Sequence, residues 1–193
     1  ANLGNYQPIT QLIAPTKLQV AVLNSSYKPS KKTTILTEVA FSNSDQNLFS
    51  TLDSEQNKGI ATKLAWQQVL LDKKWKLLSD VNYLFIHRNF NTIQRFQSVE
   101  FNRDWNLGTT GNSDQSLLVT GLHYTLAPTT NAAQNGNIKY QFEKLDFSGA
   151  FSGNRHLFGA NYKINNWRIS NQSSYLNSQS TAYNSHFTRS RST

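Results

Sequence analysis

The chain has 193 residues, of which 19 are Lys or Arg and 11 are Asp or Glu, and it contains neither Cys nor Met. Asn, Gln, Ser and Thr together account for 74 residues, while 23 aromatic residues argue against a disordered chain, whose polarity usually comes from charge and proline. This composition excludes a collagen, a coiled coil and a disulfide scaffold, and no apolar run approaches the roughly 20 residues of a membrane-spanning helix.

Apolar and polar residues alternate with a period of two along most of the chain, which is typical of strands with one apolar and one polar face. Residues 1–16, with Pro8 and Pro15, are expected to form an extended lead-in to a sheet of about ten strands over 17–193. The expected strands are 17–27, 33–43, 59–70, 75–88, 93–107, 115–127, 137–147, 155–164, 166–176 and 181–189.

Turn-forming residues separate these strands. The tight turns are predicted at Asp72-Lys73-Lys74, Asn135-Gly136-Asn137, Gly153-Asn154 and Asn165-Asn166. One longer polar loop is expected between Asn43 and Lys58. Because nearly every link is short, the sequence predicts an all-β fold with an antiparallel, up-and-down meander.

The predicted strands are 9–15 residues long, whereas strands of ordinary globular proteins have about 5–6 residues. Long strands are expected where a tilted sheet crosses a bilayer, which takes about 9–11 residues per strand. Aromatic residues such as Trp66, Trp75 and Trp167 lie near strand ends, as in the aromatic girdles of membrane barrels. These features favour a membrane β-barrel, or part of a larger one, over a soluble sandwich with an aromatic core.

The predicted meander resembles large outer-membrane β-barrel proteins of Gram-negative Bacteroidota. The Asn-, Ser- and Lys-rich composition adds to the resemblance, as in the stretch Ser98-Val99-Glu100-Phe101-Asn102-Arg103-Asp104-Trp105-Asn106-Leu107. The resemblance implies a bacterial outer-membrane location, contact with its lipid, and a role as pore wall, transport element or assembly scaffold. It brings no catalytic motif. Such barrels commonly finish on an aromatic residue, whereas this chain finishes on Arg189-Ser190-Arg191-Ser192-Thr193. We therefore expect these residues to be part of a larger barrel or a multi-chain assembly, paired with further strands or other subunits.

A barrel of this kind points its apolar face to lipid and its polar face to the lumen. The residues expected to face lipid are Ile35, Val39, Phe41, Leu64, Trp66, Tyr140 and Phe142. The residues expected to face the lumen are Glu38, Lys63, Glu100, Asp104, Lys139 and Glu143. Strand alternation would place Arg103 on the apolar side, so a bulge near Asn102 is expected to turn it inward.

No catalytic, cofactor or metal site is predicted. Glu100 and Asp104 could serve as paired carboxylates, but a lumen wall or a cross-strand ion-pair network is the preferred interpretation. The four histidines lie on different strands without metal-ligand spacing, and no nucleotide-binding, zinc-protease or hydrolase motif is present. We therefore expect a protein that is not an enzyme and needs no cofactor.

The net charge of +8 is scattered over turns and separate strands, which does not favour a nucleic-acid partner. The alternative function is that of a soluble, basic β-sheet protein that binds polysaccharide or nucleic acid. The two hypotheses differ in whether the apolar face of the sheet is exposed or buried inside a closed core.

Overall fold

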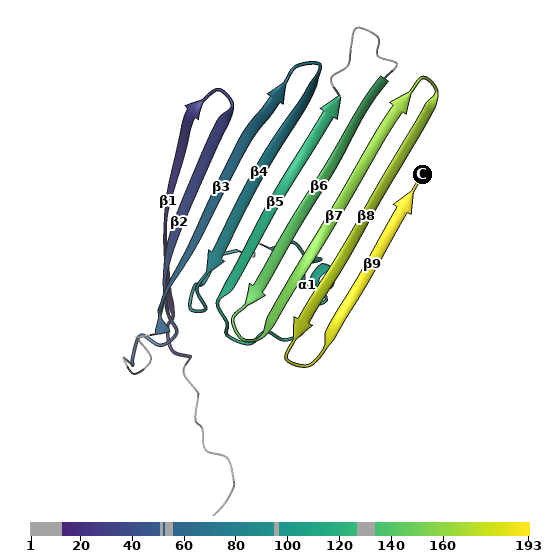
Figure 1. The fold of residues 1–193 in the computed structure, drawn as a ribbon. Helices are drawn as coiled ribbons and strands as arrows, with labels where there is room; N and C mark the ends of the chain where they lie inside the picture. The colour runs from purple at the N-terminus through teal and green to yellow at the C-terminus, as the bar shows by residue number, and fades with distance from the viewer. Residues whose placement is uncertain (1–12, 51, 53–55, 95–96, 127–133) are drawn as a thin grey trace, which may run out of the picture.

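The computed structural model describes residues 13–50, 52, 56–94, 97–126 and 134–193 (Figure 1). Most of the expected lead-in, residues 1–12, therefore lies outside the described residues. In the described part of the chain there are nine strands and one short helix, α1 (Phe101–Trp105). The strands are β1 (Lys17–Ser30), β2 (Thr33–Asp45), β3 (Lys58–Asp72), β4 (Trp75–Ile86), β5 (Gln115–Leu126), β6 (Gln134–Phe147), β7 (Phe151–Ile164), β8 (Trp167–Ser180) and β9 (Asn184–Ser192).

The strands form one antiparallel sheet in which each strand pairs with the next along the chain, in the order β1 to β9. This confirms the predicted all-β meander. The sheet is not closed into a barrel: β1 and β9 lie at its opposite edges and do not pair with each other (Figure 1). Each of these two strands therefore has one edge without a strand partner in the described structure.

Two of the predicted turns are confirmed and two are wrong. Lys73 and Lys74 connect β3 to β4, and Asn165, at a φ of 51°, helps connect β7 to β8. By contrast, Asn135-Gly136-Asn137 lies inside β6 and Gly153-Asn154 inside β7. Gly153 permits a close approach rather than a turn, since a Cβ there would lie 2.9 Å from the Phe151 ring and 3.2 Å from Trp105. The turn between β6 and β7 instead uses Gly149, at a φ of 75°.

The predicted strand at 93–107 is wrong. The described residues of this stretch belong to the long β4–β5 connection, residues 87–114, which contains α1. Arg103 forms an ion pair with Glu100 three residues earlier, at 2.8 Å, and Asn106 ends the helix in the left-handed conformation with a φ of 50°. A local helix therefore replaces the strand and the bulge expected at Asn102. We call residues 87–114 the connecting segment.

The connecting segment crosses one face of the sheet, and Figure 1 shows it passing behind the lower ends of the strands. Trp105 is 1% exposed and packs with Leu145 of β6, Phe151 of β7 and Leu176 of β8. At its other end, the backbone of Phe90 lies so close to Gly59 of β3 that a Cβ at Gly59 would lie 2.3 Å from it. We call the face that the segment covers the inner face and the opposite one the outer face.

Candidate functional site

The outer face carries rows of mainly apolar residues over much of the sheet. Strand register places Ile35, Trp66 and Val81 side by side on β2, β3 and β4, and the row continues through Thr120 to Phe142 on β6. All seven residues predicted to face lipid lie on this outer face. Because no described segment covers it, Phe41 is 53% exposed, Leu64 46% and Tyr140 40%. We call the outer surface of β2–β7 the apolar belt.

The outer face becomes more polar from β8 to β9. Trp167, Ile169 and Tyr175 still lie on the outer side of β8, but the other outer positions of β8 and those of β9 are mainly amides and hydroxyls, joined across the two strands by hydrogen bonds. Asn171 Nδ2 donates to Ser192 Oγ at 2.9 Å, and the hydroxyls of Ser173 and Ser190 lie 3.0 Å apart. Strand β9 therefore differs from the rest of the sheet, since its outer face offers no apolar surface.

The inner face is polar outside the area that the connecting segment covers. Four of the predicted lumen-facing residues lie on it, and Glu38 of β2 is directly opposite Lys63 of β3. Lys139 and Glu143 share the inner face of β6, because both alternate in phase with the core residue Leu145. A further inner pair was not predicted: His123 Nε2 lies 2.6 Å from Asp80 Oδ1, and Asn82 Nδ2 donates to the other carboxylate oxygen at 3.2 Å.

A buried ion pair ties the connecting segment to the inner face. Glu143 is 6% exposed, and its Oε2 accepts hydrogen bonds from Arg155 at 2.6 and 2.7 Å and its Oε1 one from Gln141. Arg155 also lies 3.7 Å from the Asp104 carboxylate, and its guanidinium carbon is 4.7 Å from the centre of the Trp105 ring. The structure therefore brings Asp104 and Glu143 together around one arginine.

Glu100 is linked to this network through Arg103, whose guanidinium also lies 3.8 Å from the Asp104 carboxylate. The Glu100 carboxylate pairs with Arg103 on the solvent side of α1, and both side chains are more than half exposed. Strand alternation predicts Glu100 and Asp104 on one face. In the structure the two residues are one helical turn apart, with the Asp104 amide donating to the Glu100 carbonyl oxygen at 2.8 Å, and both carboxylates contact Arg103.

The two ends of the connecting segment are joined by a salt bridge. The Arg88 guanidinium donates from Nε and Nη2 to the two oxygens of Asp114, each at 3.1 Å, and the Arg88 amide donates to the same carboxylate at 2.8 Å. The hydrogen bonds from Arg88 lower the pKa of Asp114 from 3.8 to about 2. These bonds fix the entry and exit of the segment beside the ends of β4 and β5.

Asp114→Ala is expected to loosen the connecting segment without unfolding the sheet. Because the folded-state pKa is lowered, the carboxylate stabilises the fold above about pH 4, and this contribution disappears as the pH falls through about 2. Hydrogen exchange of peptides from 87–94 should be several-fold faster in the variant at neutral pH, and the difference should shrink toward pH 2. Asp72→Ala in the β3–β4 turn is the control, and equal exchange in the two variants would contradict the assignment.

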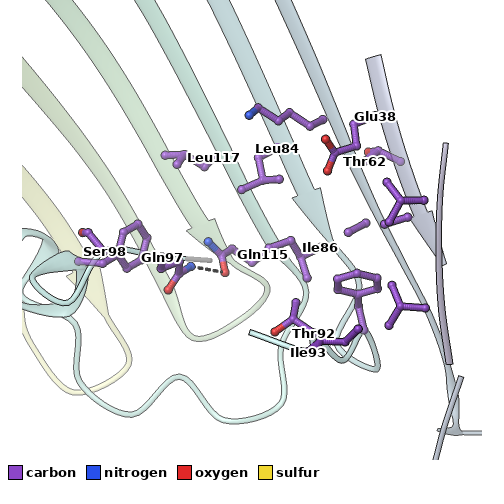
Figure 2. A pocket seen from close by; sticks show the side chains of 17 residues that line it. Glu38, Thr62, Leu84, Ile86, Thr92, Ile93, Gln97, Ser98, Gln115 and Leu117 are labelled. Carbon is purple, nitrogen blue, oxygen red and sulfur yellow. Dashed lines mark hydrogen bonds between the residues drawn. The ribbon is translucent and has the colours of Figure 1, made fainter. Parts of the chain in front are cut away.

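A half-open cavity of about 620 Å³ lies between the connecting segment and the inner face of β1–β5. Figure 2 shows Leu84, Ile86 and Leu117 on the sheet side, with Ile93 and Gln97 on the side of the segment. Gln97 Nε2 donates to Gln115 Oε1 at 2.9 Å, the dashed line in Figure 2. The buried Nε2 of Gln115 has no hydrogen-bond partner in the described structure. Strand alternation does not predict this cavity, because it predicts a strand in the segment that closes the cavity.

The described residues contain no group of three or more His, Asp or Glu side chains placed to hold a metal ion. Among them there is also no helix of the length and apolarity needed to cross a membrane. Comparisons of the chain with protein-family models, with curated protein sequences and with solved structures found no match. The functional assignment therefore depends on the two faces of the sheet.

Proposed function

We propose that this chain forms part of the wall of a β-barrel in the outer membrane of a Gram-negative bacterium of the Bacteroidota type, as a pore wall, transport element or assembly scaffold. The observation that carries the proposal is the apolar belt, which is exposed, whereas the charged residues near the middle of the strands lie on the inner face. The charged residues on the outer face of the belt lie toward strand ends, namely Asp45, Lys58 and the paired Lys144 and Asp146. Soluble proteins rarely expose contiguous apolar patches of more than a few hundred Å². Outer-membrane barrels have this inside-out arrangement, with 12–15 residues in each of β1–β8 being ample for a tilted crossing.

The open edges support an assembly rather than an isolated sheet. An unpaired backbone N–H or C=O group in hydrocarbon costs several kcal/mol, so an edge strand cannot remain bare inside a bilayer. Under the proposal, β1 and β9 pair with further strands of the same polypeptide or with another subunit. The polar outer surface of β9 fits contact with protein better than contact with lipid, so the lipid-facing surface is assigned to β2–β7.

The alternative, a soluble basic sheet protein, would require another layer over the apolar belt. The described structure places its only covering layer, the connecting segment, on the opposite face. No catalytic function or cofactor is proposed, and the Asp80–His123 pair is assigned to the polar wall of the lumen.

The proposal is tested by labelling adjacent residues that face opposite sides of β3. The chain has no cysteine, so Leu64→Cys and Lys63→Cys each give a single site for an environment-sensitive fluorophore at the same depth. In lipid vesicles, a quencher carried on the acyl chains should strongly quench the label at position 64 and leave the label at 63 nearly unaffected. Ser190→Cys on the outer face of β9 should behave like position 63.

Two results would overturn the proposal. One is equal quenching at positions 63 and 64 in vesicles. The other is a chain that stays monodisperse in buffer without detergent, with the label at position 64 already shielded from water.

A further inference from the structure

Charge is distributed unevenly along the sheet. Residues 147–193 contain no Asp or Glu but five Lys or Arg, namely Arg155, Lys163, Arg168, Arg189 and Arg191. Arg155 lies on the inner face with Trp105, and the unbroken register of β6–β9 places the other four on that face as well. The outer face of β7–β9 carries no Lys or Arg. The inner face of β7–β9 therefore carries basic residues and no acidic ones.

Most of these cations lack a carboxylate partner. Arg155 is neutralised by Glu143 and Asp104. In the part of the chain that the structure describes, no carboxylate lies within 4.0 Å of the other four cations or of Lys139 on the adjoining inner face of β6. Lys163 and Arg168 are directly opposite each other on β7 and β8, an arrangement that destabilises a sheet unless an anion lies nearby. Lys139, Lys163, Arg168, Arg189 and Arg191 are called the basic wall.

The register leaves an open strip inside the basic wall. Lys139, Gly159, Gln172 and Arg191 lie in one row across β6–β9. The row spans about 14 Å, since neighbouring strands are about 4.8 Å apart. A Cβ at Gly159 would meet no atom within 4 Å, so the space over Gly159 is open, with Lys139 on one side and Gln172, followed by Arg191, on the other. Apart from Leu157, the nearby inner positions carry amides and hydroxyls, such as Asn161 and Ser174.

We propose that the basic wall binds an anionic polysaccharide. Lys and Arg pair with its carboxylate or sulfate groups, while the amides and hydroxyls between them, such as Gln172 and Ser174, bond to sugar hydroxyl groups. A single-stranded nucleic acid would instead call for stacking aromatics interleaved with the cations. The one aromatic residue on the inner face of β9 is Phe187, and the guanidinium carbon of Arg189 already lies 5.4 Å from the centre of its ring. This inference concerns the inner face alone and holds whether or not the outer face contacts lipid.

The test measures binding of alginate, a polyuronate, to the detergent-dispersed protein at low salt, with neutral dextran as the uncharged comparison. Arg189→Gln/Arg191→Gln should weaken alginate binding at least about tenfold, the factor that follows from losing one charge-assisted contact of ordinary strength. Lys31→Gln/Lys32→Gln removes the same charge from the exposed β1–β2 turn and should change the affinity less than twofold. Binding should also weaken as salt is added.

The proposal is overturned by any of three results: no binding of alginate, equal weakening in the two double variants, or tighter binding of single-stranded DNA than of alginate. A negative result for alginate binding does not change the interpretation of the fluorophore test of the apolar belt. A negative fluorophore test likewise does not change the interpretation of the alginate measurement. Circular dichroism of each variant confirms that the sheet is intact.

Discussion

Trp105→Ala is expected to cost about 3–5 kcal/mol of folding free energy, the usual range for deleting a large buried aromatic side chain. Trp105 is 1% exposed and is the buried residue of the connecting segment in the cluster with Leu145, Phe151 and Leu176, while Phe101 and Leu107 pack against the same cluster. The substitution also removes the ring beneath the Arg155 guanidinium. Since α1 has only five residues, it cannot persist as a helix without this contact.

The connecting segment should therefore detach while the sheet persists. Limited proteolysis should cut the Trp105→Ala variant within 87–114 at least tenfold faster than the parent chain, and denaturant unfolding should shift to a lower midpoint. Trp167→Ala is the matched control, because Trp167 is 74% exposed at the β7–β8 turn. A Trp105→Ala variant as protease-resistant as the control would show that the salt bridge between Arg88 and Asp114 holds the segment without the core.

The sheet was predictable because its strands repeat with a simple period. Residues 35–42 alternate, with Ile35, Val39 and Phe41 on one side, so both the existence of the strand and the side of each residue could be predicted from the sequence. Where a segment both alternates and ends in a recognisable turn, as around Lys73 and Lys74, the predicted and observed bounds differ by only a few residues.

The connecting segment was not predictable by the same means. Phe101, Arg103 and Trp105 alternate as in a strand, yet the stretch is a turn of helix whose conformation is set by a tertiary contact, the burial of Trp105. A five-residue helix is too short to show a helical period in a sequence. The cavity, the Arg155 network and the solvent exposure of Glu100 all follow from this one segment.

Two glycines predicted to form turns instead allow close packing within strands. Gly136 and Gly153 resemble turn residues in the sequence, but each lies within a strand beneath an aromatic ring, Tyr162 in one case and Phe151 in the other. Local sequence does not distinguish a glycine that permits a positive φ from one that permits a close contact.

Arg155→Ala is expected to destabilise the protein by about 3–5 kcal/mol, because it leaves the Glu143 carboxylate buried without its cation. The Glu143 side chain is 7% exposed and that of Arg155 17%, so water does little to screen the remaining charge. Arg103→Ala is the control: its partner Glu100 is half exposed, and a surface pair of this kind contributes at most about 1 kcal/mol.

A double substitution distinguishes the stability lost by leaving the Glu143 carboxylate unpaired from the net contribution of the ion pair to the stability of the fold. Arg155→Met/Glu143→Leu replaces both ions with apolar groups of similar length, and such replacements are often neutral or even stabilising. The double variant should therefore regain most of the stability lost in Arg155→Ala, as measured by denaturant unfolding. Arg155 also contacts Asp104 and the Trp105 ring, contacts that methionine can replace only by packing. If the double variant is as unstable as Arg155→Ala, the contacts of the arginine with α1 outweigh its pairing with Glu143, and the ion pair acts chiefly by anchoring the connecting segment.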